Sequence, residues 1–274
     1  RASLQRTWRG TCPKVALRRH VGAPAAARPM TSPAPCGGVL GFEHHEIARL
    51  FPVSFVGSLP GSYLGALPVK TDTSSASQPS PALAGAHPIT LPCGTALWLL
   101  PQRAVWWPAA HMAFVADVHF GKAATFRHAG LPVPSGTTGD NLARLDAVLQ
   151  VTAAKHLVFL GDFLHARPGA DAALWAQLIP WRERHADVQM TLVRGNHDQH
   201  AGDPPQALGM ALVDEPWRPV EGAHVLACHH PQFFDEDTVL AGHLHPTARL
   251  FGRARDSLRL PCFAWASGLV VLPA

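Results

Sequence analysis

The sequence has few thiols, no long apolar run and no motif of a covalent nucleophile. Its five cysteines stand at positions 12, 36, 93, 228 and 262, without a CxxC pair or a regular spacing. An odd number of unpaired thiols favours a reducing compartment, and we therefore predict a cytoplasmic protein. No stretch approaches the roughly 18–20 apolar residues that a membrane span needs, so we expect no membrane partner. The absence of a nucleophilic serine turn argues against covalent catalysis.

Charge is also sparse and unevenly distributed. Charged residues make up 15% of the chain, and the first 42 residues contain no acid. Residues 1–86 hold nine Lys or Arg and three Asp or Glu, whereas the remainder holds 14 and 16. The basic pI therefore comes from the N-terminal third, and it is weak evidence for a nucleic-acid surface on the rest.

Residues 1–86 read as a low-complexity segment that Pro and Gly interrupt every few residues. Such a segment does not bury enough apolar surface to offset its ordering entropy, so we predict a disordered extension. Its acid-free start is also similar in composition to an organellar transit peptide. We place one folded domain at residues 87–274.

Within that domain, short apolar runs alternate with amphipathic segments. Two of the runs, Thr95–Leu100 and Arg103–Trp107, predict a hairpin, and Ala248–Phe251 with Ser257–Phe263 predicts another. Five further strands are expected at Met112–Ala116, His156–Leu160, Val188–Val193, His224–Ala227 and Thr238–Ala241. Helices are expected at Thr138–Val151 and Ala172–His185, with Pro180 kinking the second or ending it early. Strands alternating with helices indicate an α/β architecture.

Each of the five strands ends in a motif that offers metal-binding side chains. The motifs are Asp117-Val118-His119, Gly161-Asp162, Gly195-Asn196-His197-Asp198, Cys228-His229-His230 and Gly242-His243-Leu244-His245. Residues two apart in extended chain face the same side, and strand ends are where α/β sheets place ligands. The glycines permit tight turns and close backbone approach. We therefore expect the five motifs to line one cleft.

The ligand types in the motifs indicate the metal and the chemistry. Asp, Asn and His without a thiolate suit catalytic Mn²⁺, Fe or Zn²⁺, and we favour two Mn²⁺ ions. Two ions roughly 3.5–4 Å apart require a bridging carboxylate, and Asp162 stands alone in its motif. Two such ions polarise a phosphoryl group and activate a shared hydroxide, which attacks phosphorus in line.

The motif series resembles that of the calcineurin-like metallophosphoesterase superfamily, whose pattern is DxH, GD, GNH[DE], H and GHxH. The resemblance spans about residues 95–274 and implies a four-layer α/β/β/α sandwich. It implies one metal held by Asp117, His119, Asp162 and His245, and a second held by Asp162, Asn196, His229 and His243. It further implies that His197 contacts the substrate phosphate and protonates the leaving oxygen, with Asp198 orienting His197. Asn196 is expected to contact the substrate as well.

A narrower resemblance concerns the runs LWLLPQRAVWWP, DVHFGKAATFRHAGLPVPSGTT, GDFLHAR, TLVRGNHD, DEPWR and AGHLHP. They are similar to the bacterial ligase-associated DNA damage response endonucleases, which implies DNA as substrate, with a DNA ligase and a helicase as partners. His230 departs from the Glu that is common in that subfamily, so both His229 and His230 stay candidate ligands. Relatives also continue past Cys262-Phe263 into a Gly- and Phe-rich strand, and its absence predicts an unpaired sheet edge. The rival hypotheses are a phosphodiesterase for small nucleotides and a non-catalytic interaction protein on the same fold.

Other residues carry weaker alternatives. Lys122 and Arg194 are candidate phosphate-binding cations, and we assign Lys122 to substrate binding. His165 either contributes to the site or packs beside it, whereas Arg127 and His128 are expected in a solvated loop. Stacking on bases is one interpretation of the tryptophans at 98, 106 and 107, and core packing is the favoured one. Cys228 is expected to be a small buried residue rather than a ligand.

Overall fold

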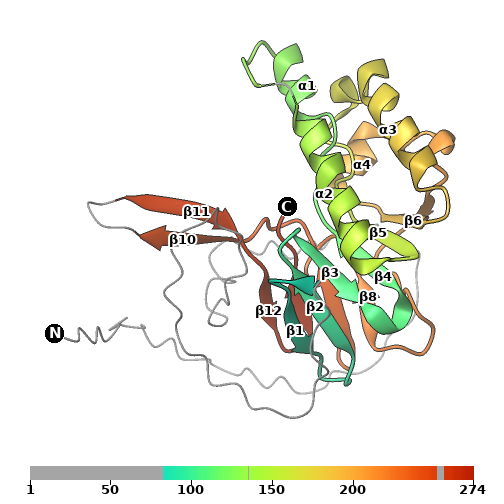
Figure 1. Cartoon of the computed structure of the whole chain (residues 1–274), viewed down its shortest axis with the longest axis vertical. Coiled ribbons are helices and arrows are strands. Elements are labelled where there is room, and N and C mark those ends of the chain that lie inside the picture. Colours follow the sequence, from blue (N-terminus) through green and yellow to red (C-terminus); the bar gives the residue numbers. More distant parts are fainter. Residues whose placement is uncertain (1–82, 135, 252–255) are drawn as a thin grey trace, which may run out of the picture. The chain divides into compact units, whose positions relative to one another are not determined.

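The structure of the protein is a computed structural model that describes residues 83–134, 136–251 and 256–274 (Figure 1). The low-complexity segment predicted over residues 1–86 lies outside the described residues except for its last four. The transit-peptide interpretation falls on residues outside the described ranges as well. Among the described residues, no helix is long and apolar enough to cross a membrane.

The larger of two packed sheets has seven strands in chain order. They are β1 (His87–Thr90), β2 (Ala96–Leu100), β3 (Ala104–Trp107), β4 (Met112–Val115), β5 (His156–Leu160), β6 (Gln189–Val193) and β7 (Ala211–Val213). Strands β1 to β4 form an antiparallel meander, and β4 to β7 run parallel. The carboxyl ends of β4, β5 and β6 therefore meet at one edge of the sheet, where three of the motifs begin.

Helices cover one face of this sheet. The helices are α1 (Lys122–His128), α2 (Thr137–Thr152), α3 (Ala172–Arg184) and α4 (Asn196–Ala201), with short 3₁₀ turns η3 (Pro108–Ala110), η4 (Arg167–Gly169) and η5 (Gln206–Leu208). Buried Leu145 of α2 and Leu178 of α3 share one apolar cluster with Leu157 and Phe159 of β5. Burial of such side chains contributes about 1.5–3 kcal/mol each.

The opposite face of the first sheet packs on a second sheet. Its four strands lie in the order β12 (Ala264–Ala266), β13 (Leu269–Val271), β9 (Thr238–Ala241) and β8 (Val225–Ala227). Val158 and Leu160 of β5 share a buried cluster with Val225 and Leu240 of this sheet. Of the predicted four-layer α/β/β/α sandwich, the helical layer on the first sheet and the two packed sheets are confirmed. In the described part of the chain, no helix residue joins the buried cluster on the outer face of the second sheet.

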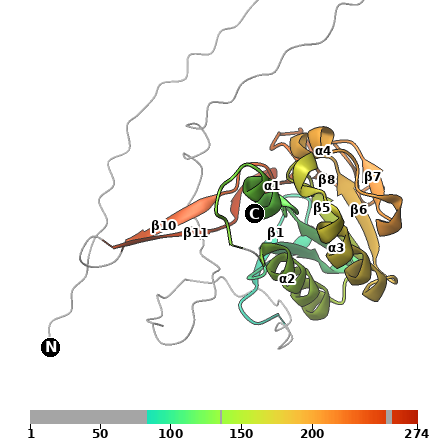
Figure 2. The same ribbon diagram turned by 90° about the horizontal axis from the view of Figure 1, so that it is seen from above.

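Strands β10 (Thr247–Phe251) and β11 (Ser257–Pro261) form a separate antiparallel hairpin. It extends away from both sheets (Figures 1 and 2). After it, β12 and β13 form a short antiparallel hairpin. Strand β13 pairs with β12 on one side and with β9 on the other. The segment after Phe263 thus supplies two strands of its own, and the sheet ends on that side at β12, which pairs with β13 alone among the described residues.

Helix α3 differs from its prediction at Pro180. Of the two effects expected of Pro180, a kink or an early end, the early end is wrong, because the helix continues past Pro180 to Arg184. Tertiary contacts on both sides of the proline account for the difference. Trp181 is buried and donates from Nε1 to Asp146 Oδ1 at 2.6 Å, and Arg182 donates from Nε to the Leu208 carbonyl at 2.8 Å. These contacts offset the hydrogen bond that proline removes.

Candidate metal centre

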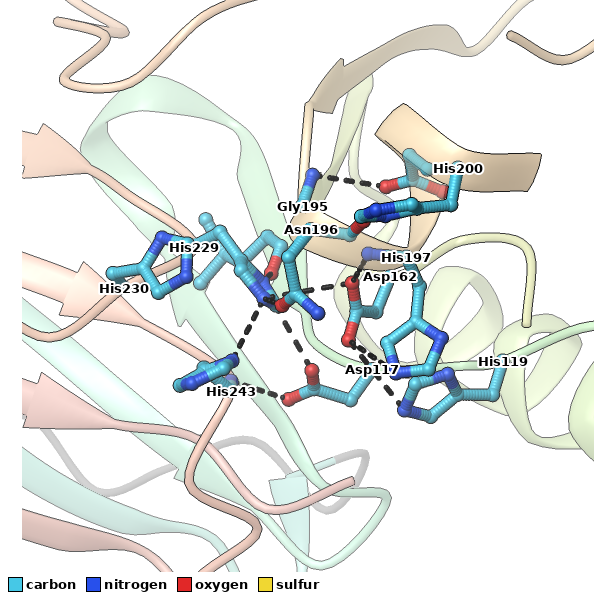
Figure 3. Close-up of polar contacts among 12 residues, drawn as sticks. Asp117, His119, Asp162, Gly195, Asn196, His197, His200, His229, His230 and His243 are labelled. Atoms are coloured by element: carbon cyan, nitrogen blue, oxygen red, sulfur yellow. Dashed lines mark hydrogen bonds and ion pairs between the residues drawn. The ribbon is translucent and has the colours of Figure 1, made fainter. Parts of the chain in front are cut away.

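The loops that follow five strands bring the predicted site residues into one cluster (Figure 3). Three loops follow β4, β5 and β6 of the first sheet, and two follow β8 and β9 of the second. The cluster contains Asp117, His119, Asp162, Asn196, His197, His229, His243 and His245. The sequence prediction that these motifs line one site agrees with their placement.

The backbone at this site is held in an uncommon conformation. Eight described residues other than glycine have positive φ, and five of them are predicted metal ligands. These five are Asp117, His119, Asp162, His243 and His245, with φ between 46° and 69°. Left-handed backbone costs an L-residue roughly 1–2 kcal/mol and persists where the surrounding structure fixes it, commonly at functional sites. Five of the eight left-handed positions therefore coincide with motif residues.

Four side chains form the first half of the cluster. His119 Nε2 lies 3.4 Å from His245 Nε2 and 3.7 Å from Asp162 Oδ2. His245 Nε2 lies 3.4 Å from Asp117 Oδ1. Burial, followed by the charges of Lys122 and neighbouring histidines, lowers the pKa of His119 to about 2. His119 is therefore neutral at physiological pH, as a metal-binding imidazole must be.

The second half of the cluster surrounds His229, whose side chain is fully buried. Its Nδ1–H donates to the Leu160 carbonyl at 3.0 Å, so Nε2 keeps its lone pair. Nε2 faces Asn196 Oδ1 at 2.9 Å, His243 Nδ1 at 3.1 Å and Asp162 Oδ1 at 3.5 Å. A backbone carbonyl on the other ring nitrogen is the usual way in which a metal-binding histidine is oriented.

The oxygens of these carboxylates are placed to hold cations. Asp162 turns Oδ2 toward His119 in the first half and Oδ1 toward His229 in the second. Among the described residues, buried Asp117 Oδ1 has no hydrogen-bond partner. A buried carboxylate oxygen without a donor is costly unless a cation lies against it. The donor set of two carboxylates, one amide and four imidazoles therefore fits two divalent ions.

The three motif glycines leave room for ligands that come from other motifs. A Cβ on Gly161 would overlap the His229 ring, one on Gly195 would overlap Asp162 Oδ1, and one on Gly242 would contact Asp117 Oδ2. Glycine is therefore required at these three positions. What approaches the glycines is the ligand side chains themselves.

His197 is oriented by a group that the sequence did not indicate. Its Nδ1–H donates to the His165 carbonyl at 2.7 Å, and its ring stacks on that of His165 at 5.0 Å. Asp198, expected to orient His197, instead accepts from the backbone N–H groups of Leu164 and Gly195, both at 3.0 Å. The expected contact is replaced because Asp198 lies at the third position of α4, where it caps the helix.

Glu215 is a site residue that sequence reasoning missed. Its carboxylate accepts from the backbone N–H groups of His229 and His230 at 2.7 and 2.8 Å. It also accepts from His230 Nδ1 at 2.6 Å, which raises the pKa of His230. Glu215 thus holds the His230 side chain, which is 44% exposed, whereas the buried side chain of His229 faces the other ligands. This geometry favours His229 as the ligand. Only the DEPWR run pointed to this segment.

The weaker candidates separate clearly. Lys122 begins α1 and is exposed beside His119. Arg194 bonds to Asp203 and Asp214, so its guanidinium is occupied by carboxylates. Arg127 and His128 lie in α1, not in the expected loop. Trp106 and Trp107 are buried in the clusters on the two faces of the first sheet, and partly buried Trp98 packs against the cluster of Trp106. Cys228 is buried, and burial raises the pKa of its thiol to about 12. Core packing and a buried thiol were the favoured interpretations.

Comparisons with known proteins agree with the motifs. The family described as calcineurin-like phosphoesterase matches residues 110–249, a range that ends within β10. The crystal structure of Pseudomonas putida nuclease MPE is similar to this chain, at 43% sequence identity and a TM-score of 0.58. The similarity covers 69% of this chain and 86% of that one. No curated protein matches the sequence.

Proposed function

Because the chain belongs to the calcineurin-like phosphoesterase family and is therefore a metal-dependent phosphoesterase, we propose that it cleaves phosphodiester bonds in DNA with two divalent metal ions. Mn²⁺ is the proposed metal. Asp117, His119, Asp162 and His245 would hold one ion, and Asp162, Asn196, His229 and His243 the other. The similarity to a P. putida nuclease supports a nucleic-acid substrate.

One observation carries the two-metal proposal. The two oxygens of Asp162 face different sets of ligands, at 3.7 Å from His119 Nε2 and 3.5 Å from His229 Nε2. The carboxylate is held there by the His197 backbone N–H, which donates to Oδ1 at 2.9 Å. When bound, two divalent ions would polarise the phosphoryl group and lower the pKa of a water.

The chain's own residues would bind the substrate and handle the proton. His197 donates Nδ1–H to the His165 carbonyl, so its Nε2 is the atom free to pass a proton to the leaving oxygen. That atom lies 4.0 Å from Asp162 Oδ2, beside the metal ligands. Lys122 offers an exposed ammonium at the start of α1 for a phosphate oxygen. In this proposal Asn196 contacts the substrate as well.

The proposal is tested by hydrolysis of bis-p-nitrophenyl phosphate by metal-stripped protein titrated with Mn²⁺, Fe²⁺ or Zn²⁺. Single-stranded and double-stranded DNA are tested in parallel, with Asp162→Asn as the variant that removes the shared carboxylate. Activity that returns with Mn²⁺ and extends to DNA supports the proposal. Hydrolysis of the small diester without cleavage of DNA would instead favour small nucleotides, and activity of Asp162→Asn equal to wild type would contradict the bridging role.

Three expectations from the sequence stay predictions. They are an association with a DNA ligase and a helicase, a role in DNA repair, and a cytoplasmic location. Co-purification of the protein with a ligase from the same cells, before and after nuclease treatment, would test the first. Loss of the association after treatment would place DNA, and no direct contact, between the two proteins.

A further inference from the structure

The hairpin β10–β11 begins beside the metal centre. Thr247 is two residues after His245, and Cys262 N–H donates to the Pro246 carbonyl at 3.0 Å, which closes the base of the hairpin. Five residue pairs continue outward from Thr247 opposite Pro261 to Phe251 opposite Ser257. We call residues 247–251 and 257–261 the arm. It projects from the sheets in both views (Figures 1 and 2).

One face of the arm carries two facing arginines. Arg249 and Arg259 are paired directly across the strands, and both are exposed. Within the described ranges neither has an ion pair, whereas half-buried Arg194 bonds to Asp203 and exposed Arg218 bonds to Asp237. Like charges directly opposite each other destabilise a strand pair unless an anion lies between them. The pair therefore fits an anionic ligand.

An aromatic side chain lies on the same face. Alternate residues of a strand point the same way, so Phe251 projects on the side of Arg249. With 77% exposure, Phe251 is the most exposed of the large apolar side chains in the described part of the chain. Cations beside an exposed ring are the combination that binds single-stranded nucleic acid, because the ring stacks on bases of any sequence.

We propose that the arm is a docking surface for single-stranded DNA that leads a strand into the metal centre. The inference rests on the proposed function and names the form of its substrate. Residues 87–274 hold 14 Lys or Arg and 16 Asp or Glu, so attraction of DNA to this domain has to come from local clusters such as the arm. From His245 to Phe251 the chain advances about 20 Å at roughly 3.3 Å per residue. At about 3.4 Å per phosphate, that length matches about six nucleotides of B-form strand.

The test measures binding without cleavage. A fluorescein-labelled oligothymidylate is titrated in EDTA at 50–200 mM salt, with fluorescence polarisation as the readout. The arm variant is R249Q/R259Q, and the matched control K155Q/R184Q also removes two charges. Lys155 directly precedes β5, and Arg184 ends α3, which leads into the start of β6. The control charges thus lie at the end of the sheet opposite the metal centre. Hydrolysis of bis-p-nitrophenyl phosphate is measured on every variant.

R249Q/R259Q should lower the slope of log affinity against log salt by about 1.4, at about 0.7 per phosphate contact on a single strand. The affinity ratio between 50 and 200 mM salt then shrinks by about sevenfold. F251A should weaken binding about tenfold. K155Q/R184Q should bind as wild type, and all variants should hydrolyse the small diester normally.

An unchanged salt slope in R249Q/R259Q would overturn the arm proposal, as would an equal drop in K155Q/R184Q. If the arm variants instead change the sedimentation coefficient and leave DNA binding intact, the arm contacts a second copy of the chain and the proposal fails. Absence of diester hydrolysis in wild type would refute the proposed function alone, because binding in EDTA is measured independently of turnover.

Discussion

The close approach of Gly161 to His229 gives a prediction whose magnitude can be worked out in steps. Gly161 has φ of +77°, and an added Cβ would overlap the His229 ring. Gly161→Ala therefore carries two costs. Left-handed backbone costs about 1–2 kcal/mol in alanine. Displacing His229 also breaks its bond to the Leu160 carbonyl, and a buried carbonyl left without a donor costs about 1–3 kcal/mol.

Two other glycines separate these costs. Gly94 has φ of +83° with no atom within 4 Å of an added Cβ, so Gly94→Ala measures backbone strain alone. Gly139 lies in α2 with equally open surroundings and no positive φ. Gly139→Ala should therefore raise the free energy of unfolding by about 0.4–1 kcal/mol. We expect the free energy of unfolding to fall by about 1–2 kcal/mol in Gly94→Ala and by about 2–5 kcal/mol in Gly161→Ala.

The assay is urea unfolding of metal-free protein, followed by titration calorimetry with Mn²⁺. Gly161→Ala should lower the affinity for the ion nearest His229 by about 10–100-fold, which is the usual effect of disturbing a residue that supports a ligand. The other two variants should bind both ions as wild type. If Gly161→Ala costs no more stability than Gly94→Ala and keeps two tight ions, the account of ligand packing against the motif glycines is wrong.

Four further predictions follow from the site. Glu215→Gln keeps one acceptor oxygen for three donors, so the ion at His229 should bind about 10–100-fold more weakly than in wild type, and an unchanged affinity for that ion in calorimetry would contradict this. His197→Ala should slow cleavage of esters with poor leaving groups far more than p-nitrophenyl esters, and equal losses would rule out the proton-donor role. Asp198→Ala should lower the free energy of unfolding in EDTA by about 1–3 kcal/mol, because two backbone donors lose their acceptor. An unchanged urea unfolding curve would refute the capping role of Asp198. Mn²⁺ at a hundredfold excess over its dissociation constant should raise the free energy of unfolding by about 2.7 kcal/mol per site. A melting temperature independent of Mn²⁺ would contradict metal binding.

The parts of the fold that could be predicted well depend on local patterns. Strands β4, β5 and β6 are short apolar runs that end in polar motifs, so both their positions and their common edge could be inferred. The glycines marked the turns at the same edge. Helix α2 was placed to within one residue at each end, because its leucines repeat at helical spacing.

The features that could not be predicted depend on contacts between distant segments. Glu215 supports His229 and His230 from 14 residues away, through backbone donors that leave no pattern in the sequence. The carbonyl of His165 orients His197, and a backbone oxygen carries no residue identity. The left-handed backbone at Asp117 and His243 is equally invisible, since neither residue type requires it. The early end that was one of two expectations for Pro180 does not occur, because tertiary contacts of Trp181 override local preference.

The most direct test of the two-ion site is the number of Mn²⁺ ions that remain bound per chain after gel filtration, measured by mass spectrometry on wild type and Asp162→Asn. Because the oxygens of Asp162 face both halves of the cluster, we predict two ions in wild type and at most one in Asp162→Asn, with loss of diester hydrolysis. One ion in fully active wild type, or two ions and full activity in Asp162→Asn, would contradict the account.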